Sequence, residues 1–125
     1  MTVIRSLPNL EVLKLKDNAF IGAEWECSDG EFPRLKFLLM DGLNLICWRV
    51  ESTHHFPCLE RLIITRCWKL EEIPCEIEEI PTLQLIEVVR ASKSAANSAV
   101  SIQEEQRDLG NDVLQVRIRD REEEN

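Results

Sequence analysis

The 125-residue sequence has no run of basic residues, and its formal net charge is −8. Nucleic acids and anionic membranes bind clustered lysines and arginines that displace counterions, so the sequence disfavours both as ligands. Long apolar runs are missing too: stretches such as Phe37–Met40 and Leu62–Ile64 are far shorter than the roughly 20 residues of a membrane-spanning helix. We therefore expect a soluble chain without a transmembrane segment.

Signals of secretion are also missing. Met1–Pro8 lacks the long apolar core of a signal peptide, and the chain contains no Asn-x-Ser/Thr sequon. We therefore expect an intracellular, cytoplasmic protein. The cysteines make an odd count, lack tight paired spacing and stand mostly among apolar neighbours: Cys27, Cys47, Cys58, Cys67 and Cys75. Reduced thiols, packed as small hydrophobic side chains, are the expected state.

Motifs for cofactors and catalysis are sparse. The glycines are isolated and form no G-x-x-x-x-G-K-[ST] loop, so the sequence predicts no nucleotide site. His54 and His55 stand near Cys58 without the paired spacings of a structural zinc site. The glutamates between Glu71 and Glu79 are more typical of a solvated face than of a tuned acid and base pair, and a Cys–His nucleophile has only residue type in its favour. We predict no enzymatic activity, no cofactor and no metal.

An internal repeat organises the chain. Four prolines recur at intervals of 25, 24 and 24 residues, and each is followed two positions later by a leucine. The pairs are Pro8 and Leu10, Pro33 and Leu35, Pro57 and Leu59, and Pro81 and Leu83. Apolar residues follow three and five positions after each leucine: Leu13 and Leu15, Leu38 and Met40, Leu62 and Ile64, and Ile86 and Val88. This is the L-x-x-L-x-L pattern of leucine-rich repeats.

Two later repeat positions fit less regularly. Eight residues after the first leucine, the pattern favours Asn or Cys to hydrogen-bond the turning backbone. Asn18 and Cys67 fit, whereas Leu43 and Ala91 depart from the rule. Eleven residues after that leucine, an apolar residue is expected to close the turn in three repeats but not in the fourth: Ile21, Ile46 and Leu70, against Ser94.

One such repeat is a short strand with a return segment, which buries too little apolar surface to offset its own ordering entropy. Stacking supplies the missing burial. The sequence therefore predicts an α/β leucine-rich-repeat solenoid, with parallel strands on a concave face and loops or helical turns on a convex face. Strands are expected near residues 12–16, 36–41, 61–65 and 84–89.

The segments between and after the strands differ. Gly22–Glu31 is polar and is expected to be a loop, whereas Leu70–Pro81 has the spacing of a helical or 3₁₀ turn with its glutamates in water.

After Ala91 the repeat stops. A helix is expected over about 94–109, ending at Gly110 and placing Ala96, Val100 and Ile102 near one side. Residues 113–118 alternate like a last edge strand. We predict about four coils over 1–91, a capping segment over 92–118 and a disordered charged tail over 119–125.

Three phrases carry a family resemblance: Leu7-Pro-Asn-Leu-Glu-Val-Leu-Lys-Leu-Lys, Phe56-Pro-Cys-Leu-Glu-Arg-Leu and Cys67-Trp-Lys-Leu-Glu-Glu-Ile-Pro. They resemble the terminal leucine-rich repeats of plant nucleotide-binding disease resistance proteins of the late-blight-resistance type. The resemblance implies a receptor with a signalling domain, a nucleotide switch domain and this terminal solenoid, which senses pathogen effectors and restrains the switch. Because no phosphate loop is present, ATP binding is not carried over to this chain.

The predicted binding surface consists of the solvent-facing strand positions on the concave face: Val12, Lys14, Lys16, Phe37, Leu39, Asp41, Arg61, Ile63, Thr65, Leu85, Glu87 and Val89. Phe37, Leu39, Ile63 and Leu85 are expected to lie close together, and an exposed apolar patch marks a binding face. The alternative is that the register is imperfect, or that these side chains cover one another or dock against other domains. For Trp25, Trp48 and Trp68, packing in the core or a loop is favoured over an interface role.

The predicted function is protein recognition in plant immunity, with an effector, a host target or the receptor's own nucleotide-binding domain as partner. Two alternatives stay open. The repeats could hold the substrate of a ubiquitin ligase, or the chain could be a truncated product without a role of its own, with Leu10, Leu13 and Leu15 exposed at an uncapped edge.

Overall fold

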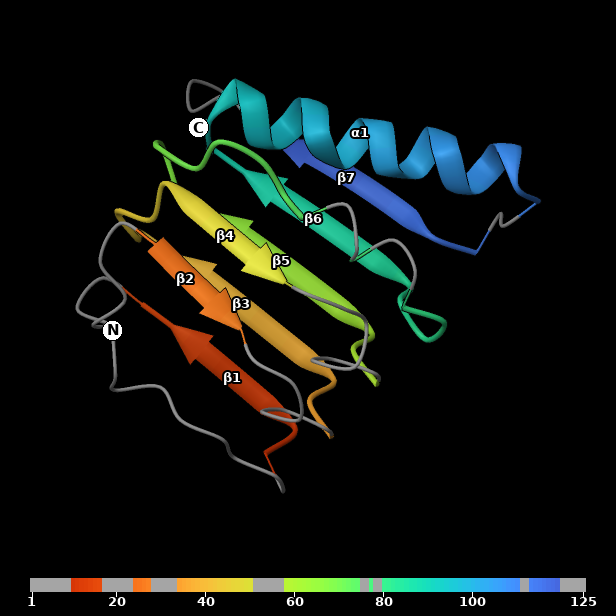
Figure 1. Ribbon diagram of the computed structural model, residues 1–125, viewed down its shortest axis with the longest axis horizontal. Helices are drawn as coiled ribbons and strands as arrows, with labels where there is room; N and C mark the ends of the chain where they lie inside the picture. Colours follow the sequence, from red (N-terminus) through yellow and green to blue (C-terminus); the bar gives the residue numbers. More distant parts are fainter. Residues whose placement is uncertain are drawn as a thin grey trace.

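The computed structural model describes residues 10–16, 24–27, 34–50, 58–74, 77, 80–110 and 113–119. Five parallel strands form its main sheet, which lies beside one long helix in an α/β arrangement (Figure 1). In spatial order the strands are β1 (Val12–Leu15), β3 (Phe37–Asp41), β5 (Arg61–Thr65), β6 (Leu85–Val89) and β7 (Gln115–Arg119). The four strands predicted from the repeat and the predicted last edge strand are therefore confirmed, within one or two residues at their ends.

The register of the sheet follows the repeat. Leu13 pairs with Leu38, Leu38 with Leu62, and Leu62 with Ile86. The entries to β3, β5 and β6 repeat as well, because one carbonyl accepts two amides from the next coil, which is the next strand with the segments that lead into and out of it. The Glu11 carbonyl accepts from Lys36 and Phe37 at 2.8 and 3.1 Å, and the Lys36 carbonyl accepts from Glu60 and Arg61 at 2.9 and 3.0 Å. Equivalent positions of successive repeats therefore lie side by side.

The core lies on one face of this sheet. Side chains alternate along each strand, and the inward leucines and isoleucines of β3, β5 and β6 are buried completely, for example Leu38, Leu62 and Ile86. Burying a leucine contributes about 1.5–3 kcal/mol, so this layer supplies a large part of the stabilisation. At the β1 edge, Leu15 is buried whereas Leu10 and Leu13 are half-buried.

A left-handed turn follows three of the strands at the same repeat position. Gly42, Arg66 and Arg90 have φ of 70°, 53° and 51°. Their amides donate to the last residue of the neighbouring strand: Gly42 to the Thr65 carbonyl at 2.8 Å, Arg66 to the Val89 carbonyl at 2.9 Å, and Arg90 to the Arg119 carbonyl. A non-glycine residue in this conformation costs about 1–2 kcal/mol, which these bonds offset. The turn therefore closes each coil onto the next.

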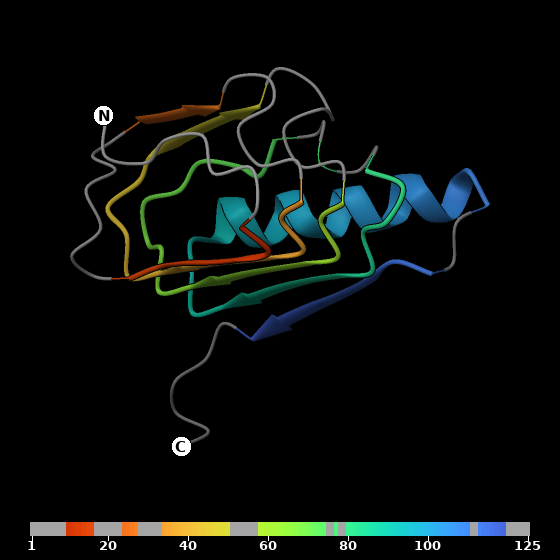
Figure 2. The ribbon, with the colours of Figure 1, turned by 90° about the horizontal axis from the view of Figure 1, so that it is seen from below.

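A second, smaller sheet overturns one expectation. Residues 24–27, expected to lie in a loop, form β2 (Glu24–Cys27), which pairs in parallel with β4 (Cys47–Val50). The physical reason is the stacking of the coils, because β4 offers β2 backbone partners that neither segment has locally. Figure 2 shows this pair of strands and the helix on the same side of the five-stranded sheet.

The return segment after β5 turns as the sequence predicted. The amide of every third residue donates to the carbonyl three residues earlier: Ile77 to Pro74 at 3.0 Å, Ile80 to Ile77 at 3.1 Å and Leu83 to Ile80 at 3.2 Å. This is the bonding of a 3₁₀ turn. Glu71 and Glu72 are exposed, as expected, whereas Glu76, Glu78 and Glu79 lie outside the described residues.

The prediction of which apolar residue closes each turn is confirmed for one repeat and wrong for another. Leu70 is buried at 1% exposure, as predicted. In the repeat before it, Ile46 is only half-buried, and its neighbour Leu45 is buried completely. Ile46 stands directly before β4, where the backbone already aligns with the next coil through the bond from the Glu71 amide to the Ile46 carbonyl at 2.9 Å. Ile21 lies outside the described residues, and Ser94 is exposed.

Helix α1 spans Lys93–Asp108, close to the expected range. Ser92 is its N-cap, accepting the Ala95 amide at 3.0 Å, and Gly110 follows its end with φ of 93°. Its inward side was predicted partly wrongly, because Val100 is 38% exposed. The buried stripe consists of Ala95, Ala96, Ala99 and Ile102. Ala95, Ala99 and Ile102 lie three or four residues apart on one helical face, whereas Val100 follows Ala96 at the margin of that face.

Two serines attach α1 to the return segment after β5. The Ser92 hydroxyl donates to the Leu70 carbonyl. The Ser98 oxygen accepts the Ile73 amide at 3.0 Å, and its hydroxyl donates to the Ile73 carbonyl at 3.1 Å. The helix therefore continues the stacking by satisfying backbone groups of the coil before it. Among the described residues, no helix is both long and apolar enough to cross a bilayer.

The Ser98 pair of hydrogen bonds gives a stability prediction. Ser98→Ala removes both partners of Ile73 and is expected to lower the free energy of unfolding by about 1–2 kcal/mol. Urea unfolding followed by circular dichroism measures the change. Ser101→Ala is the matched control, because Ser101 is exposed on the same helix and its loss is expected to stay within about 0.5 kcal/mol. Equal effects of the two substitutions would contradict the anchoring role of Ser98.

Candidate functional site

The second face of the five-stranded sheet is its open face, because no described helix or strand packs on it (Figure 2). All twelve predicted binding residues are partly or fully exposed. Eleven lie in β1, β3, β5 and β6 and alternate with the buried positions, whereas Lys16 follows the end of β1. The structure thus places the predicted set on one surface. Whether this surface binds a partner stays a prediction.

Three rows cross the open face, as the register of the strands defines them. The first row is Val12, Phe37, Arg61, Leu85 and Gln115. The second row is Lys14, Leu39, Ile63, Glu87 and Arg117. The third row is Asp41, Thr65, Val89 and Arg119.

The predicted apolar patch is present but interrupted. Leu39 and Ile63 are direct cross-strand partners, and Phe37 stands on the same strand as Leu39. Leu85 is separated from Phe37 by Arg61 in the first row and lies diagonally beside Ile63. All four apolar residues are half-buried. Side chains at such spacings touch across a sheet, so they partly cover one another and still present apolar surface to solvent.

Charged side chains surround this patch. Lys14, Lys16, Arg61, Arg117 and Arg119 are exposed on the open face or at its margin. Among the described residues of the face, the carboxylates are Asp41 and Glu87, and each has an arginine beside it. Arg66 Nε lies 2.9 Å from Asp41 Oδ1, and Arg119 Nε lies 3.9 Å from Glu87 Oε2. The exposed charge of this face is therefore mainly positive.

Sequence reasoning missed the contribution of β7. Gln115, Arg117 and Arg119 extend the three rows by one strand and are exposed. The alternation over 113–118 indicated the strand, and its outward residues follow from that alternation once β7 is known to pair in parallel with β6. The predicted disordered tail began at Arg119, which belongs to β7, and residues 120–125 lie outside the described part of the chain.

The tryptophans have unlike environments. Trp48, on β4, is 3% exposed and packs in the core, as predicted. Trp68 is 52% exposed, so the predicted packing is wrong there. It follows the left-handed turn at Arg66, which carries the chain outward at the end of β5. The side chain of Trp25 lies outside the described residues.

Cys67 occupies the repeat position that favours Asn or Cys. It is buried, and its Sγ lies 3.6 Å from the Met40 carbonyl oxygen and 3.4 Å from the Thr65 carbonyl oxygen, so the thiol links two successive coils. Burial raises the pKa of the Cys67 thiol, although the nearby backbone amides act in the opposite direction. At the same position Leu43 and Ala91 are buried without a polar group, and Asn18 lies outside the described residues.

The expected burial of the other cysteines is only partly met. Cys47 and Cys58 are free thiols but half-buried, and Cys47 Sγ lies 3.6 Å from a carboxylate oxygen of Glu71. Cys75, His54 and His55 lie outside the described residues, as does the side chain of Cys27. Within the described part of the chain, no cluster of three or more His, Cys, Asp or Glu side chains is arranged to hold a metal ion.

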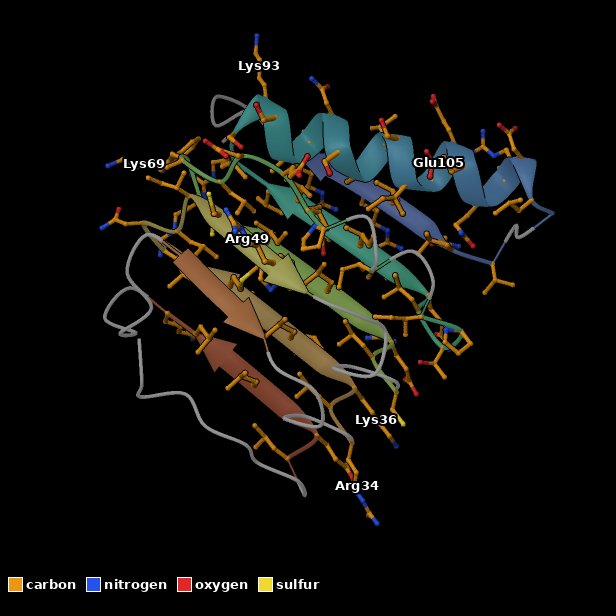
Figure 3. All side chains as sticks on the ribbon, in the orientation of Figure 1. Arg34, Lys36, Arg49, Lys69, Lys93 and Glu105 are labelled. Carbon is orange, nitrogen blue, oxygen red and sulfur yellow. The ribbon has the colours of Figure 1, made fainter. Side chains whose placement is uncertain are left out.

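On the other side of the molecule, residues of α1 and of the return segment line a hollow of about 440 Å³. Glu71, Glu72 and Glu105 line it together with serines and Asn97 of the helix. Figure 3 labels Glu105 on α1 among the side chains of this side. The residues lining the hollow include neither a cysteine nor a histidine.

The raised pKa of Cys67 gives a prediction of thiol reactivity. The thiolate is the reactive form, so iodoacetamide at pH 8 is expected to modify Cys67 at least about tenfold more slowly than Cys47 or Cys58. Peptide mass spectrometry of timed samples measures each rate. The same reaction in urea is the control, because unfolding is expected to make the rates similar. Rapid modification of Cys67 in the folded chain would contradict its burial between the coils.

Comparison with known proteins shows which proteins the chain is similar to. It matches no protein-family model. It is 45% identical over 101 residues to late blight resistance protein homolog R1B-16 of Solanum demissum, and 44% identical to homologs R1B-13 and R1B-23 of the same plant. The alignments cover 80% of this chain but only 8% or 9% of those relatives. The aligned residues are therefore similar to a short region of late blight resistance protein homologs, which confirms the resemblance seen in the repeats.

Proposed function

We propose that the chain is part of a leucine-rich-repeat solenoid that recognises proteins for a plant intracellular immune receptor. The observation that carries the proposal is the open face, where Phe37, Leu39 and Ile63 leave apolar surface in solvent on adjacent strands. An apolar cluster rimmed by charged residues is the composition of protein interfaces. The partner is a pathogen effector, a host target or the receptor's own nucleotide-binding domain, and the site of action is the cytoplasm.

Two features support the solenoid. Five parallel strands stand in register with the same turn after three of them, and α1 takes the place of a return segment between β6 and β7. In a stacked array each coil contacts only its neighbours, and here the hydrogen bonds of each strand entry run to the adjacent coil. The repeat in the sequence and the repeat in the backbone both support this proposal.

The role we propose is non-catalytic. The described residues of the open face are strand side chains of aliphatic, aromatic and mainly cationic type, and its two carboxylates are each close to an arginine. Side chains of this kind, arranged in this way, are typical of a recognition surface and not of an acid and base pair directed at a reacting group. The relatives favour a receptor over the substrate-binding repeats of a ubiquitin ligase, because they are named as resistance protein homologs.

A double substitution tests the open face. Phe37→Asp with Ile63→Asp places two charges in the apolar patch, and binding of partner proteins is expected to weaken at least about thirtyfold, since an apolar anchor contributes about 2 kcal/mol or more. The chain serves as bait in leaf extract, captured proteins are identified by mass spectrometry, and their affinities are measured with purified components.

The control for this test is Val100→Asp with Leu109→Asp, because both residues are exposed apolar side chains away from the open face. Both double variants are expected to keep the circular dichroism spectrum of the starting chain. Loss of the same partners from the control variant, or full affinity in the Phe37 and Ile63 variant, would refute the proposal.

A further inference from the structure

The charge of the open face is opposite in sign to that of the whole chain. The formal net charge is −8, yet the exposed charged side chains in the rows of the face and at its margin are the lysines and arginines Lys14, Lys16, Arg61, Arg117 and Arg119. On the other side of the sheet, exposed carboxylates dominate on α1 and the return segment: Glu71, Glu72, Glu104, Glu105 and Asp108. The exposed charge is therefore mainly positive on the open face and mainly negative on α1 and the return segment, where Lys93 and Arg107 are outnumbered by carboxylates.

Neither carboxylate of the open face cancels this charge on its own. Asp41 lies 2.9 Å from Nε of Arg66, a residue that directly follows the end of β5. Glu87 is largely covered, with 18% of its side chain exposed, and Arg119 lies beside it with 67% of its side chain exposed. An approaching partner therefore meets cationic groups first and the carboxylates second.

The charges also have an order across the strands. Lys14 and Lys16 belong to the β1 edge, and Arg117 and Arg119 belong to β7 at the opposite edge. The apolar residues Phe37, Leu39, Ile63 and Leu85 occupy the three strands between, with Arg61 among them. In the second row this order reads Lys14, Leu39, Ile63, Glu87 and Arg117.

From this arrangement we infer that the open face binds an acidic protein segment that has apolar side chains at its centre and carboxylates at both ends. Four strand spacings of about 4.8 Å give about 19 Å between the edges, which an extended segment of about six residues spans. Carboxylates at its ends then meet the two cationic edges, while its apolar side chains lie on Leu39 and Ile63. The inference rests on the proposed function and names the chemistry of its partner.

A synthetic peptide provides the probe: fluorescein-labelled Glu-Glu-Leu-Phe-Leu-Glu-Glu, titrated with the full chain and followed by fluorescence polarisation. We expect saturable binding that weakens as sodium chloride is raised, because salt screens exposed charges. Two further peptides separate the parts of the claim. Replacing every Glu by Lys, or replacing the Leu-Phe-Leu centre by Ser-Ser-Ser, is expected to weaken binding at least about tenfold. A lysine peptide that binds as tightly as the glutamate peptide would overturn the inference.

Charge reversal of the chain tests the two edges directly. Lys14→Glu with Arg117→Glu is expected to weaken binding of the glutamate peptide more than about tenfold, because like charges then face each other. The matched control is Lys93→Glu with Arg107→Glu, which makes the same change in net charge on exposed positions of α1. Figure 3 shows Lys93 extending from the start of this helix, away from the sheet. Equal losses in the two variants would mean that overall charge, not the open face, governs binding, and would refute the inference.

The outcome also separates this inference from the proposed function. Protein partners that are lost on Phe37→Asp with Ile63→Asp but retained on Lys14→Glu with Arg117→Glu would leave the open face as a binding surface and reject the acidic partner. Partners retained by both variants would reject the proposed function itself. Thermal unfolding of each variant, expected to stay close to that of the starting chain, shows that the changes act on the surface and not on the fold.

Discussion

The inward row of Leu13, Leu38, Leu62 and Ile86, half-buried at Leu13 and completely buried at the other three, is the constraint on which the open face depends. Strand side chains alternate between the two faces, so a slip of one residue would turn every buried leucine outward and every outward residue into the core. The hydrophobic cost of such a slip fixes the pairing. Once the leucines are in register, the positions of Phe37, Leu39 and Ile63 on the surface follow without any interaction of their own.

Hydrogen bonds fix the backbone at the ends of the coils. Apolar burial is not directional, so it does not orient the backbone there. The left-handed turns at Gly42, Arg66 and Arg90 aim each amide at the neighbouring strand. Glycine adopts this conformation freely, whereas an arginine is held in it by the bonds it makes. For Arg66 these include the contact with Asp41 in the preceding coil. Cys67 and Ser98 act in the same way, each satisfying backbone groups of another coil. The coils thus depend on one another for hydrogen bonds as well as for burial.

The sequence revealed what depends on local spacing and missed what depends on pairing at a distance. The strands and α1 were predicted because their apolar residues recur with the period of the element. The pairing of β2 with β4 was not, because the alternation in Glu-Trp-Glu-Cys covers only four residues of a polar segment, and this strand acquires its partners only when the coils stack. For the same reason Leu45 replaced Ile46 in the core. The outward set of the first four strands came from alternation alone, whereas the arginines of β7 needed the knowledge that β7 joins the same sheet.

The net charge of the chain does not exclude anionic partners for every part of its surface. A formal charge of −8 disfavours anionic partners for the molecule as a whole, yet the open face itself is cationic. At physiological ionic strength an exposed charge is screened over about 8 Å, and packed layers lie about 10 Å apart. The glutamates of α1 and of the return segment are therefore largely screened from a partner on the open face. What such a partner meets is set by Arg61, Arg117 and their neighbours, whose positions only the register of the strands defines.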